Sequence, residues 1–283
     1  MIASIQKQTG AGVRQVCRVL GAPRSSFYHA AKPSAMQLRD ELACELIETL
    51  FKQHRRRYGH RRIHHELAAR GVLCAPSRVR RIMALKGLRA IQPKNFPPKT
   101  SDGKASRPAP NLLAGMREVS QPNQVWTADI TFIPIATGWL YLALVMDLCS
   151  RRILGWQLAV HMRSDLVLQA FTQAMQWRRP AAGAIFHSDR GSQFASVRFR
   201  CALHAAGFRQ SMSAPSNPYD NAWTESFNGT LKREMLQRGS FQNFQDAQTE
   251  IFEYIDAYYN TRRLHSALAY SSPAQFERDS FNL

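Results

Sequence analysis

Three strand-like segments follow one another between residues 125 and 159, and their order limits the folds open to this chain. In residues 125–132 apolar and polar side chains alternate, which predicts a half-buried strand with Asp129 on its polar side. Segments 139–148 and 151–159 meet at a tight connection, so we expect three antiparallel strands. Further helices and strands are then expected at 164–177, 184–188, 195–206, 208–213 and from about Glu225. This order predicts an α/β domain in which helices flank a mixed sheet.

Three acidic residues stand at boundaries of these expected elements. Asp129 lies on the first strand, Asp189 follows a short apolar run where a buried strand opens into a polar loop, and Glu225 begins a helical pattern. Asn228 and Lys232 share one side of that helix with Glu225, at about one-turn spacing. Each acid alone is explained as an exposed charge or a helix cap. The common position of all three favours a cluster that binds cations.

Such a cluster suits one kind of chemistry. Magnesium and manganese prefer carboxylate and water oxygens, and they need few protein ligands when phosphate oxygens complete the shell. Two such ions about 4 Å apart can activate a water or hydroxyl and stabilise the leaving oxygen of a phosphodiester. We therefore expect Asp129, Asp189 and Glu225 to be metal ligands and catalytic residues in phosphoryl transfer, with no serine or tyrosine nucleophile.

Several longer strings carry a family resemblance that covers about residues 50–280. They read WTADITFIP, VMDLCSRRILGW, HSDRGSQF, DNAWTESFNGTLKRE and YYNTRRLHSALAYSSPAQF. On these residues the chain resembles the DDE transposases of two-reading-frame bacterial insertion sequences, specifically the second-frame product with its retroviral-integrase-like core. The resemblance implies a ribonuclease-H-like catalytic core, preceded by small all-α helix-turn-helix regions.

The resemblance also implies an activity, a cofactor and partners. The expected activity is metal-dependent cleavage and strand transfer by transesterification at the ends of an insertion sequence, with two Mg²⁺ or Mn²⁺ ions per site. Asp129, Asp189 and Glu225 match the catalytic triad, and Lys232 matches a basic position that touches DNA near the scissile phosphate. Terminal inverted repeats and target DNA are the expected substrates of a homo-multimer on DNA. A role for the first-frame protein stays open. Leu264 replaces the usual proline of the tail.

Basic charge is concentrated in the N-terminal part. The formal net charge is +18, and residues 1–120 carry 23 Lys and Arg against 7 Asp and Glu. This distribution favours salt-dependent binding to the phosphates of nucleic acid over a merely soluble basic face. The longest apolar run, Trp139–Met146, is too short to span a bilayer, so we expect no membrane contact and a cytoplasmic, nucleoid-associated protein in bacteria.

Composition and helical patterns predict five regions. They are a helical region at 1–52, a helix-turn-helix region at 53–91, a basic Pro/Ser-rich linker at 92–122, a catalytic core at 123–235, and a C-terminal helix and tail at 236–283. Helix-turn-helix patterns occur at residues 12–30 and 54–91. They place Arg24, Arg78 and Arg81 as candidate DNA contacts.

A few residues resemble functional groups but have simpler explanations. No acid or cysteine completes a metal site with His60, His64 and His65 except Glu66, which is expected to point elsewhere on the helix, and the five cysteines form no paired motif. Asp147 is expected to make an ion pair or a turn cap, not a fourth metal ligand. Near the C-terminus we expect an amphipathic helix from Phe244 to Tyr259 and a polar tail ending at Pro273. Within that tail, DNA contact and bracing of the core stay open for three residues, Arg262, Arg263 and His265.

Two other functions share parts of this pattern. A ribonuclease-H-like nuclease would use the same carboxylates but would cleave without joining. A DNA-binding regulator with an inactive core would keep the basic region and lack metal-dependent cleavage.

Overall fold

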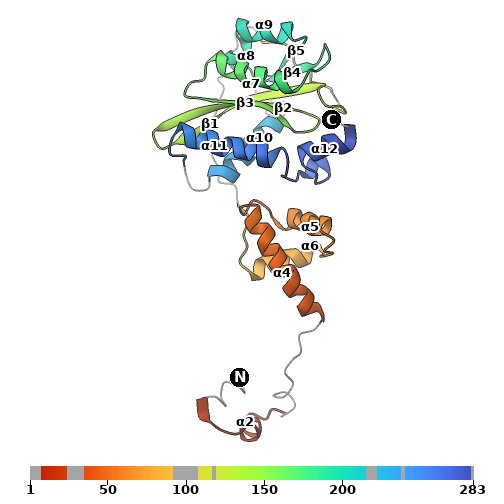
Figure 1. The fold of residues 1–283 in the computed structure, drawn as a ribbon, viewed down its shortest axis with the longest axis vertical. Coiled ribbons are helices and arrows are strands. Elements are labelled where there is room, and N and C mark those ends of the chain that lie inside the picture. The colour runs from red at the N-terminus through yellow and green to blue at the C-terminus, as the bar shows by residue number, and fades with distance from the viewer. Residues whose placement is uncertain are drawn as a thin grey trace. The chain divides into compact units, whose positions relative to one another are not determined.

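The computed structural model describes residues 8–23, 35–91, 108–116, 119–214, 222–236 and 240–281, with the backbone alone at 35–41. Arg24 therefore lies outside the described residues, as does most of the expected 92–122 linker. The chain divides into two compact units, Met1–Ala90 and Ile91–Leu283 (Figure 1). None of the described helices is both long and apolar enough to cross a membrane.

The first unit is helical. Its described helices are α2 (Val13–Val19), α4 (Ala35–Gln53), α5 (His60–Ala69) and α6 (Pro76–Leu85). The periodic apolar residues of α4, α5 and α6 are buried together, among them Leu50, Leu67 and Val79. Gly71 lies two residues after the end of α5, its φ of +76° suits a residue without a Cβ, and the next helix begins with Pro76. The helix-turn-helix expected within 54–91 is thus present as α5 and α6.

The second unit is built on a five-stranded sheet in the order β3-β2-β1-β4-β5. Its strands are β1 (Val125–Ile135), β2 (Gly138–Asp147), β3 (Ile153–Ala159), β4 (Ile185–Ser188) and β5 (Arg209–Met212). The β1–β2 and β2–β3 pairs are antiparallel, whereas β4 pairs in parallel with both β1 and β5. The predicted mixed sheet with three leading antiparallel strands is confirmed.

Helices cover both faces of this sheet (Figure 1). On one face α7 (Ser164–Trp177), α8 (Ser192–Ala195) and α9 (Val197–Ala205) pack against a core that contains Trp126, Phe171 and Phe186. On the other face lie α10 (Ala222–Met235), α11 (Phe244–Phe252) and its π-helical continuation η3 (Glu253–Tyr259). They bury a second core with Ile133, Phe227 and Tyr254.

The expectation that β1 is half-buried is wrong. This strand is central in the sheet and is buried from Val125 to Thr131, so its polar residues Thr127, Asp129 and Thr131 are also enclosed. The reason is tertiary: α10 packs against β1 and shields the side that the alternating pattern assigned to solvent. The catalytic candidate on this strand therefore sits inside the protein.

Asp147 closes the connection between β2 and β3, as the turn-cap interpretation predicted. Its Oδ1 accepts hydrogen bonds from the backbone N–H of Cys149 at 2.9 Å and of Ser150 at 3.0 Å, and its Oδ2 accepts one from Asn123 at 2.6 Å. Burial raises the pKa of Asp147, and these donors oppose the rise. The carboxylate is structural and is occupied by backbone donors.

A helix that no sequence pattern predicted follows the expected polar tail at Pro273. After η4 (Ser266–Leu268) the chain forms another helix, α12 (Pro273–Phe281), in which the proline takes the first turn. Glu277 of this helix is fully buried and forms ion pairs with Arg152 at 2.6 Å and with Arg178. Those long-range partners hold α12 on the core, and no local pattern reveals them.

Candidate active site

Asp129 lies at the middle of β1 and keeps only 8% of its surface exposed. Its Oδ1 accepts a hydrogen bond from the backbone N–H of Ile130 at 2.9 Å. Its Oδ2 accepts one from the Nδ2 of Asn228, which α10 places over the strand, at 2.7 Å. The carboxylate is thus held by two donors from different elements.

Asp189 reaches the same region through the parallel pairing of β4 with β1. Ser188 at the end of β4 pairs with Ala128 of β1. Asp129 and Asp189 each come directly after one member of this pair. The Oδ1 of Asp189 accepts from the backbone N–H of Gly191 at 3.0 Å, which shapes the loop after the strand. This placement at a strand end is the one that the sequence predicted.

Glu225 is in the first turn of α10 and is exposed. The three carboxylates act on one another electrostatically. Burial raises the pKa of Asp129 to about 8, with a further contribution from Asp189 and a smaller one from Glu225. Burial also raises the pKa of Glu225, and Asp189 adds to the rise. The fold therefore brings into mutual range three acids that are far apart in the sequence.

The three carboxylates lie in one region without meeting at a single point. Across the described ranges, no three His, Cys, Asp or Glu side chains converge closely enough to hold a metal ion. Like charges repel, and the raised pKa values of Asp129 and Glu225 report that repulsion together with burial. An exposed Glu225 side chain has room to move toward the two aspartates.

Two further residues of α10 belong to this region. Lys232 is partly buried, its pKa is lowered by burial, and the charge of Asp129 opposes that change. Asn228 is buried and its amide nitrogen contacts Asp129, whereas its Oδ1 has no hydrogen-bond partner among the residues that the structure describes. The sequence pattern placed Asn228 beside Glu225 but assigned it no role. The available signal was its spacing of one helical turn after the glutamate.

Two of the three candidate DNA-binding arginines, Arg78 and Arg81, lie on α6. Val79, Ile82 and Met83 are buried, whereas Arg81 is exposed and Arg78 is partly exposed on the other side of the helix. His64 uses Nδ1 to contact the carbonyl oxygen of Cys74 at 2.8 Å.

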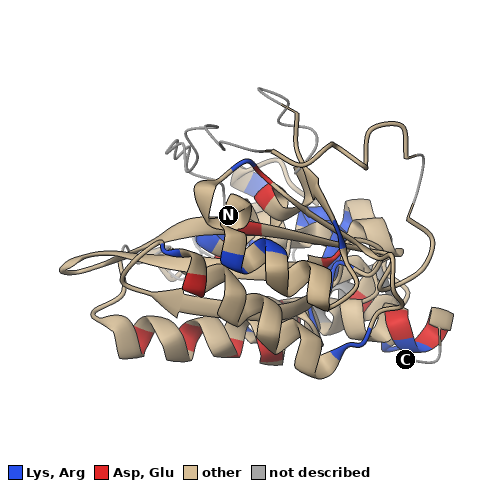
Figure 2. Ribbon diagram, turned by 90° about the horizontal axis from the view of Figure 1, so that it is seen from above, with Lys and Arg blue, Asp and Glu red and all other residues tan. Residues whose placement is uncertain are grey.

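Charged residues of both signs occur along the helices (Figure 2). The tail arginines behave differently from each other, because Arg262 is exposed while Arg263 is buried against Glu234. Of the two roles left open by the sequence, bracing of the core is the one realised by Arg263.

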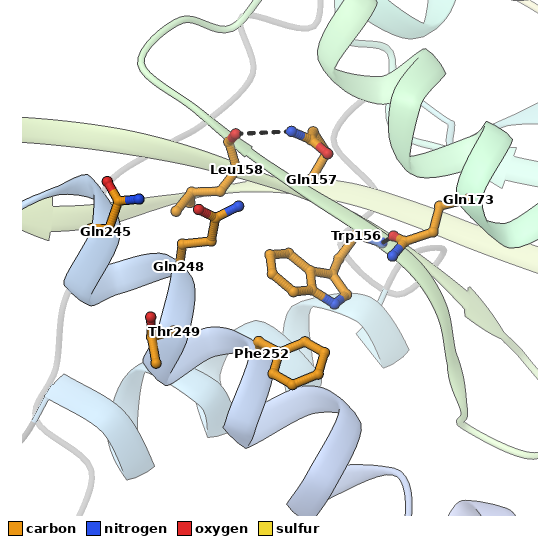
Figure 3. A pocket seen from close by; sticks show the side chains of 8 residues that line it. All are labelled: Trp156, Gln157, Leu158, Gln173, Gln245, Gln248, Thr249 and Phe252. Atoms are coloured by element: carbon orange, nitrogen blue, oxygen red, sulfur yellow. Dashed lines mark hydrogen bonds between the residues drawn. The ribbon is translucent and has the colours of Figure 1, made fainter.

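A pocket of about 410 Å³ lies elsewhere, at the outer edge of the sheet (Figure 3). Trp156 and Leu158 of β3 line one side, and Gln248 and Phe252 of α11 line the opposite side. Strand β2 separates β3 from β1, and no carboxylate lines the pocket. It is therefore distinct from the acidic cluster.

Comparisons with known protein families match both units. The family described as Integrase core domain matches residues 119–218, a second family of that description matches residues 206–273, and a family described as HTH-like domain matches residues 37–96.

Individual relatives span nearly the whole chain. The transposase for insertion sequence element IS904 of Lactococcus lactis subsp. lactis (strain IL1403) is 42% identical over 247 residues, which are 87% of this chain and 98% of that protein. Transposase InsF for insertion sequence IS3A of Escherichia coli (strain K12) is 34% identical over 269 residues, which are 94% of this chain and 93% of that protein.

Two viral proteins are among the solved structures that align with this chain. The simian T-cell lymphotropic virus intasome, in complex with PP2A regulatory subunit B56 gamma, aligns with a TM-score of 0.48 at 16% identity and covers 75% of this chain and 69% of its own. The HTLV-2 integrase catalytic core domain in complex with magnesium, in its dimeric form, aligns with a TM-score of 0.42 at 18% identity, over 55% of this chain and 96% of its own.

Proposed function

Because this chain belongs to the DDE transposases of insertion sequences, enzymes with an integrase core domain that cleave and transfer DNA strands, we propose that Asp129, Asp189 and Glu225 are its catalytic carboxylates. The observation that supports this assignment most directly is the pairing of Ala128 with Ser188, which sets Asp129 beside Asp189, together with the packing of α10, the helix of Glu225, on β1. Asp189 raises the pKa of both Asp129 and Glu225, although the three come from β1, the loop after β4 and α10.

The donor set suits a hard divalent cation. Carboxylate oxygens are the preferred ligands of Mg²⁺ and Mn²⁺, and the buried Asn228 Oδ1 that lacks a partner adds another oxygen beside Asp129. We propose that all three acids hold magnesium or manganese, two ions per site, with Glu225 swinging in from its exposed position. When bound, such ions would neutralise charge and activate the attacking oxygen.

The reaction divides into two displacements at phosphorus. In the first, water attacks the phosphorus of a phosphodiester at the element end and the bond from phosphorus to the 3′-oxygen breaks, so the cut strand is left with a 3′-hydroxyl on one fragment and a 5′-phosphate on the other. In the second, that 3′-oxygen forms a new bond to a phosphorus of the target, and the 3′-oxygen of the target strand leaves. The number of phosphodiester bonds is conserved in the second step, and no covalent protein–DNA intermediate is needed. Positioning and charge neutralisation supply the catalysis.

The surrounding residues place the substrate. Lys232 projects near Asp129 from the helix that carries Glu225, so we propose that its ammonium group contacts the DNA phosphate next to the scissile bond. Helix α6 with Arg78 and Arg81, and Arg24 outside the described residues, are proposed to bind terminal inverted repeats. We further propose that the enzyme assembles as a homo-multimer on DNA and engages the first-frame protein of its element.

A strand-transfer assay on oligonucleotides of the element ends tests the site. Asp129→Asn, Asp189→Asn and Glu225→Gln are each expected to abolish cleavage and transfer while end binding in a gel-shift assay stays near that of the unmodified protein. Asp279→Asn on α12 is the matched control, because it removes an exposed carboxylate outside the cluster. Normal transfer by any of the three variants would remove that residue from the assignment. Cleavage without joining by the unmodified protein would favour a nuclease.

A further inference from the structure

A buried ion pair links the helix of the active site to the C-terminal part of the chain. Arg263 donates to Glu234 of α10 from Nη2 at 2.8 Å and from Nε at 3.2 Å, and both side chains are only 5% exposed. Tyr254 donates from its hydroxyl to Oε2 of the same glutamate at 2.8 Å. Burying both charges carries a desolvation penalty, which the close geometry and the added hydrogen bond must offset. Removal of either side chain would break this ion pair inside the protein.

The same stretch of chain is also attached to the sheet. Asn260 pairs with the backbone of Ile153 at the start of β3: its Nδ2 donates to the carbonyl at 2.9 Å, and its Oδ1 accepts from the N–H at 3.0 Å. Beside it, the ring of Tyr259 packs edge-on against Phe227 of α10, with 4.6 Å between ring centroids. The tail motif, Tyr259–His265, therefore contacts both the edge of the sheet and α10.

The position of Glu234 on α10 makes this contact relevant to the site. Phe227, Leu231 and Glu234 follow one another at intervals of four and three residues and form the buried stripe of the helix. Glu225, Asn228 and Lys232 form the adjacent stripe. Because a helix turns 100° and rises about 1.5 Å per residue, any rotation or slide that moves Glu234 moves the site residues with it.

We propose that the tail motif is a positioning element for α10, and that Arg263 acts through Glu234 to hold Glu225 and Lys232 at the correct rotation beside Asp129. The inference deepens the proposed function and rests on it, because α10 matters for catalysis only if those residues do. The proposal also gives a role to the tail motif, which carries part of the family resemblance and takes no part in the proposed chemistry. Arg263 and Glu234 are both buried, so the proposal makes them positioning residues and not catalytic ones.

The test compares two buried glutamates with similar surroundings. Glu234→Gln and Arg263→Met disrupt the proposed contact. Glu277→Gln is the matched control, because Glu277 is likewise buried and likewise accepts from arginines and from a hydroxyl, that of Ser150 at 2.8 Å, but lies on α12. The full-length protein is used without metal or DNA for hydrogen exchange of residues 222–235, and with both for steady-state strand transfer.

We expect Glu234→Gln and Arg263→Met to speed amide exchange in α10 at least tenfold and to lower kcat at least tenfold, with little change in KM for DNA ends. Glu277→Gln should lower the thermal unfolding midpoint about as much as Glu234→Gln does. At equal folded fraction, however, it should leave amide exchange in α10 and kcat near the values of the unmodified protein. Tyr254→Phe, which keeps the ion pair and removes one hydrogen bond, should fall between the unmodified protein and Glu234→Gln.

Unchanged exchange of α10 in Glu234→Gln would overturn the proposal whatever the activity. Equal losses of kcat in Glu234→Gln and Glu277→Gln would also overturn it, because general stability would then explain both. If exchange rises as expected while Glu225→Gln transfers strands normally, the tail's hold on α10 is supported and the proposed catalytic assignment fails. The two ideas are therefore tested by separate measurements.

Discussion

The side-chain amide of Asn228 on α10 donates a hydrogen bond from Nδ2 to Oδ2 of Asp129 on β1, at 2.7 Å. The bond crosses from a helix to the central strand of the sheet, and it fixes the orientation of the deepest carboxylate of the proposed site. The Oδ1 of the same amide is buried and finds no partner within the described part of the chain. A polar group in that state is costly unless a further ligand or water completes it.

Substitution of Asn228 should therefore impair strand transfer although the residue is not one of the three acids. Asn228→Ala removes the donor to Asp129, and we expect a loss of about 10- to 100-fold in rate, as for other residues that orient metal ligands. Asn228→Asp should be worse, because it places another carboxylate against Asp129. Single-turnover transfer rates measured over a range of Mg²⁺ concentrations test this order. Full activity of Asn228→Ala at every concentration would contradict it.

The raised pKa of Asp129 predicts how the metal-free protein responds to pH. Its pKa is about 8 in the folded state, mainly through burial, and about 3.9 is typical of an unfolded chain. Between these values the folded state binds the extra proton, so the free energy of unfolding falls as pH rises from about 4 to about 8 and then levels off. Asp129→Asn lacks this contribution. Urea unfolding at pH 5 and pH 8 without metal should show a larger loss for the unmodified protein than for Asp129→Asn.

Metal binding should expel that proton. Since cation binding requires the ionised carboxylate, we expect Mg²⁺ affinity to rise with pH up to about 8 and proton release to accompany binding near pH 7. Calorimetry in two buffers of different ionisation enthalpy measures the release directly. Binding without proton exchange at pH 7 would show that Asp129 does not take part.

Lys232 should contribute to DNA contact more than to folding. Burial lowers the pKa of Lys232 because it disfavours the charged ammonium group, and the negative charge of Asp129 opposes this effect. A DNA phosphate beside the ammonium group would stabilise its charge in the same way. Lys232→Gln is expected to weaken binding of element ends and to reduce the salt dependence of binding by about one phosphate contact. Lys232→Arg keeps the charge and should retain most of the affinity. Filter binding across a salt series distinguishes the two, and an unchanged salt slope in Lys232→Gln would argue against the contact.

Gly155 should tolerate no side chain, because β3 and α7 approach each other there. A Cβ at this position would lie 2.2 Å from the carbonyl oxygen of Ala170 and 2.7 Å from the backbone nitrogen of Ala174. Gly155→Ala is expected to destabilise the fold by about 3 kcal/mol or more, since backbone atoms must shift. Gly229→Ala on α10 is the contrasting control, with its closest neighbour at 4.0 Å, and it should stabilise the helix by up to about 1 kcal/mol. Denaturant unfolding midpoints of the Gly155→Ala and Gly229→Ala variants test this difference. Equal midpoints would refute the steric argument.

The order of strands and helices could be predicted because it rests on local patterns. The three leading strands, the helix from Ser164 to Trp177 and the turn at Asp147 each follow from side chains within a short window. The family strings likewise identify Asp129, Asp189 and Glu225 by their immediate neighbours. These features depend on periodicity and on residue type at a given spacing, which a single sequence contains in full.

Tertiary packing decided everything that depends on which surfaces meet. The burial of Asp129 follows from α10 lying over β1, and the helix at Pro273 is held by the contacts of Glu277 with Arg152 and Arg178. The pairing of Arg263 with Glu234 joins residues far apart in the chain. Short-range sequence patterns do not reveal such contacts, because they do not show whether a distant element or water covers a polar side chain. The sequence by itself determined which residues can perform the chemistry, and the fold decided how deeply they are buried and what holds them in place.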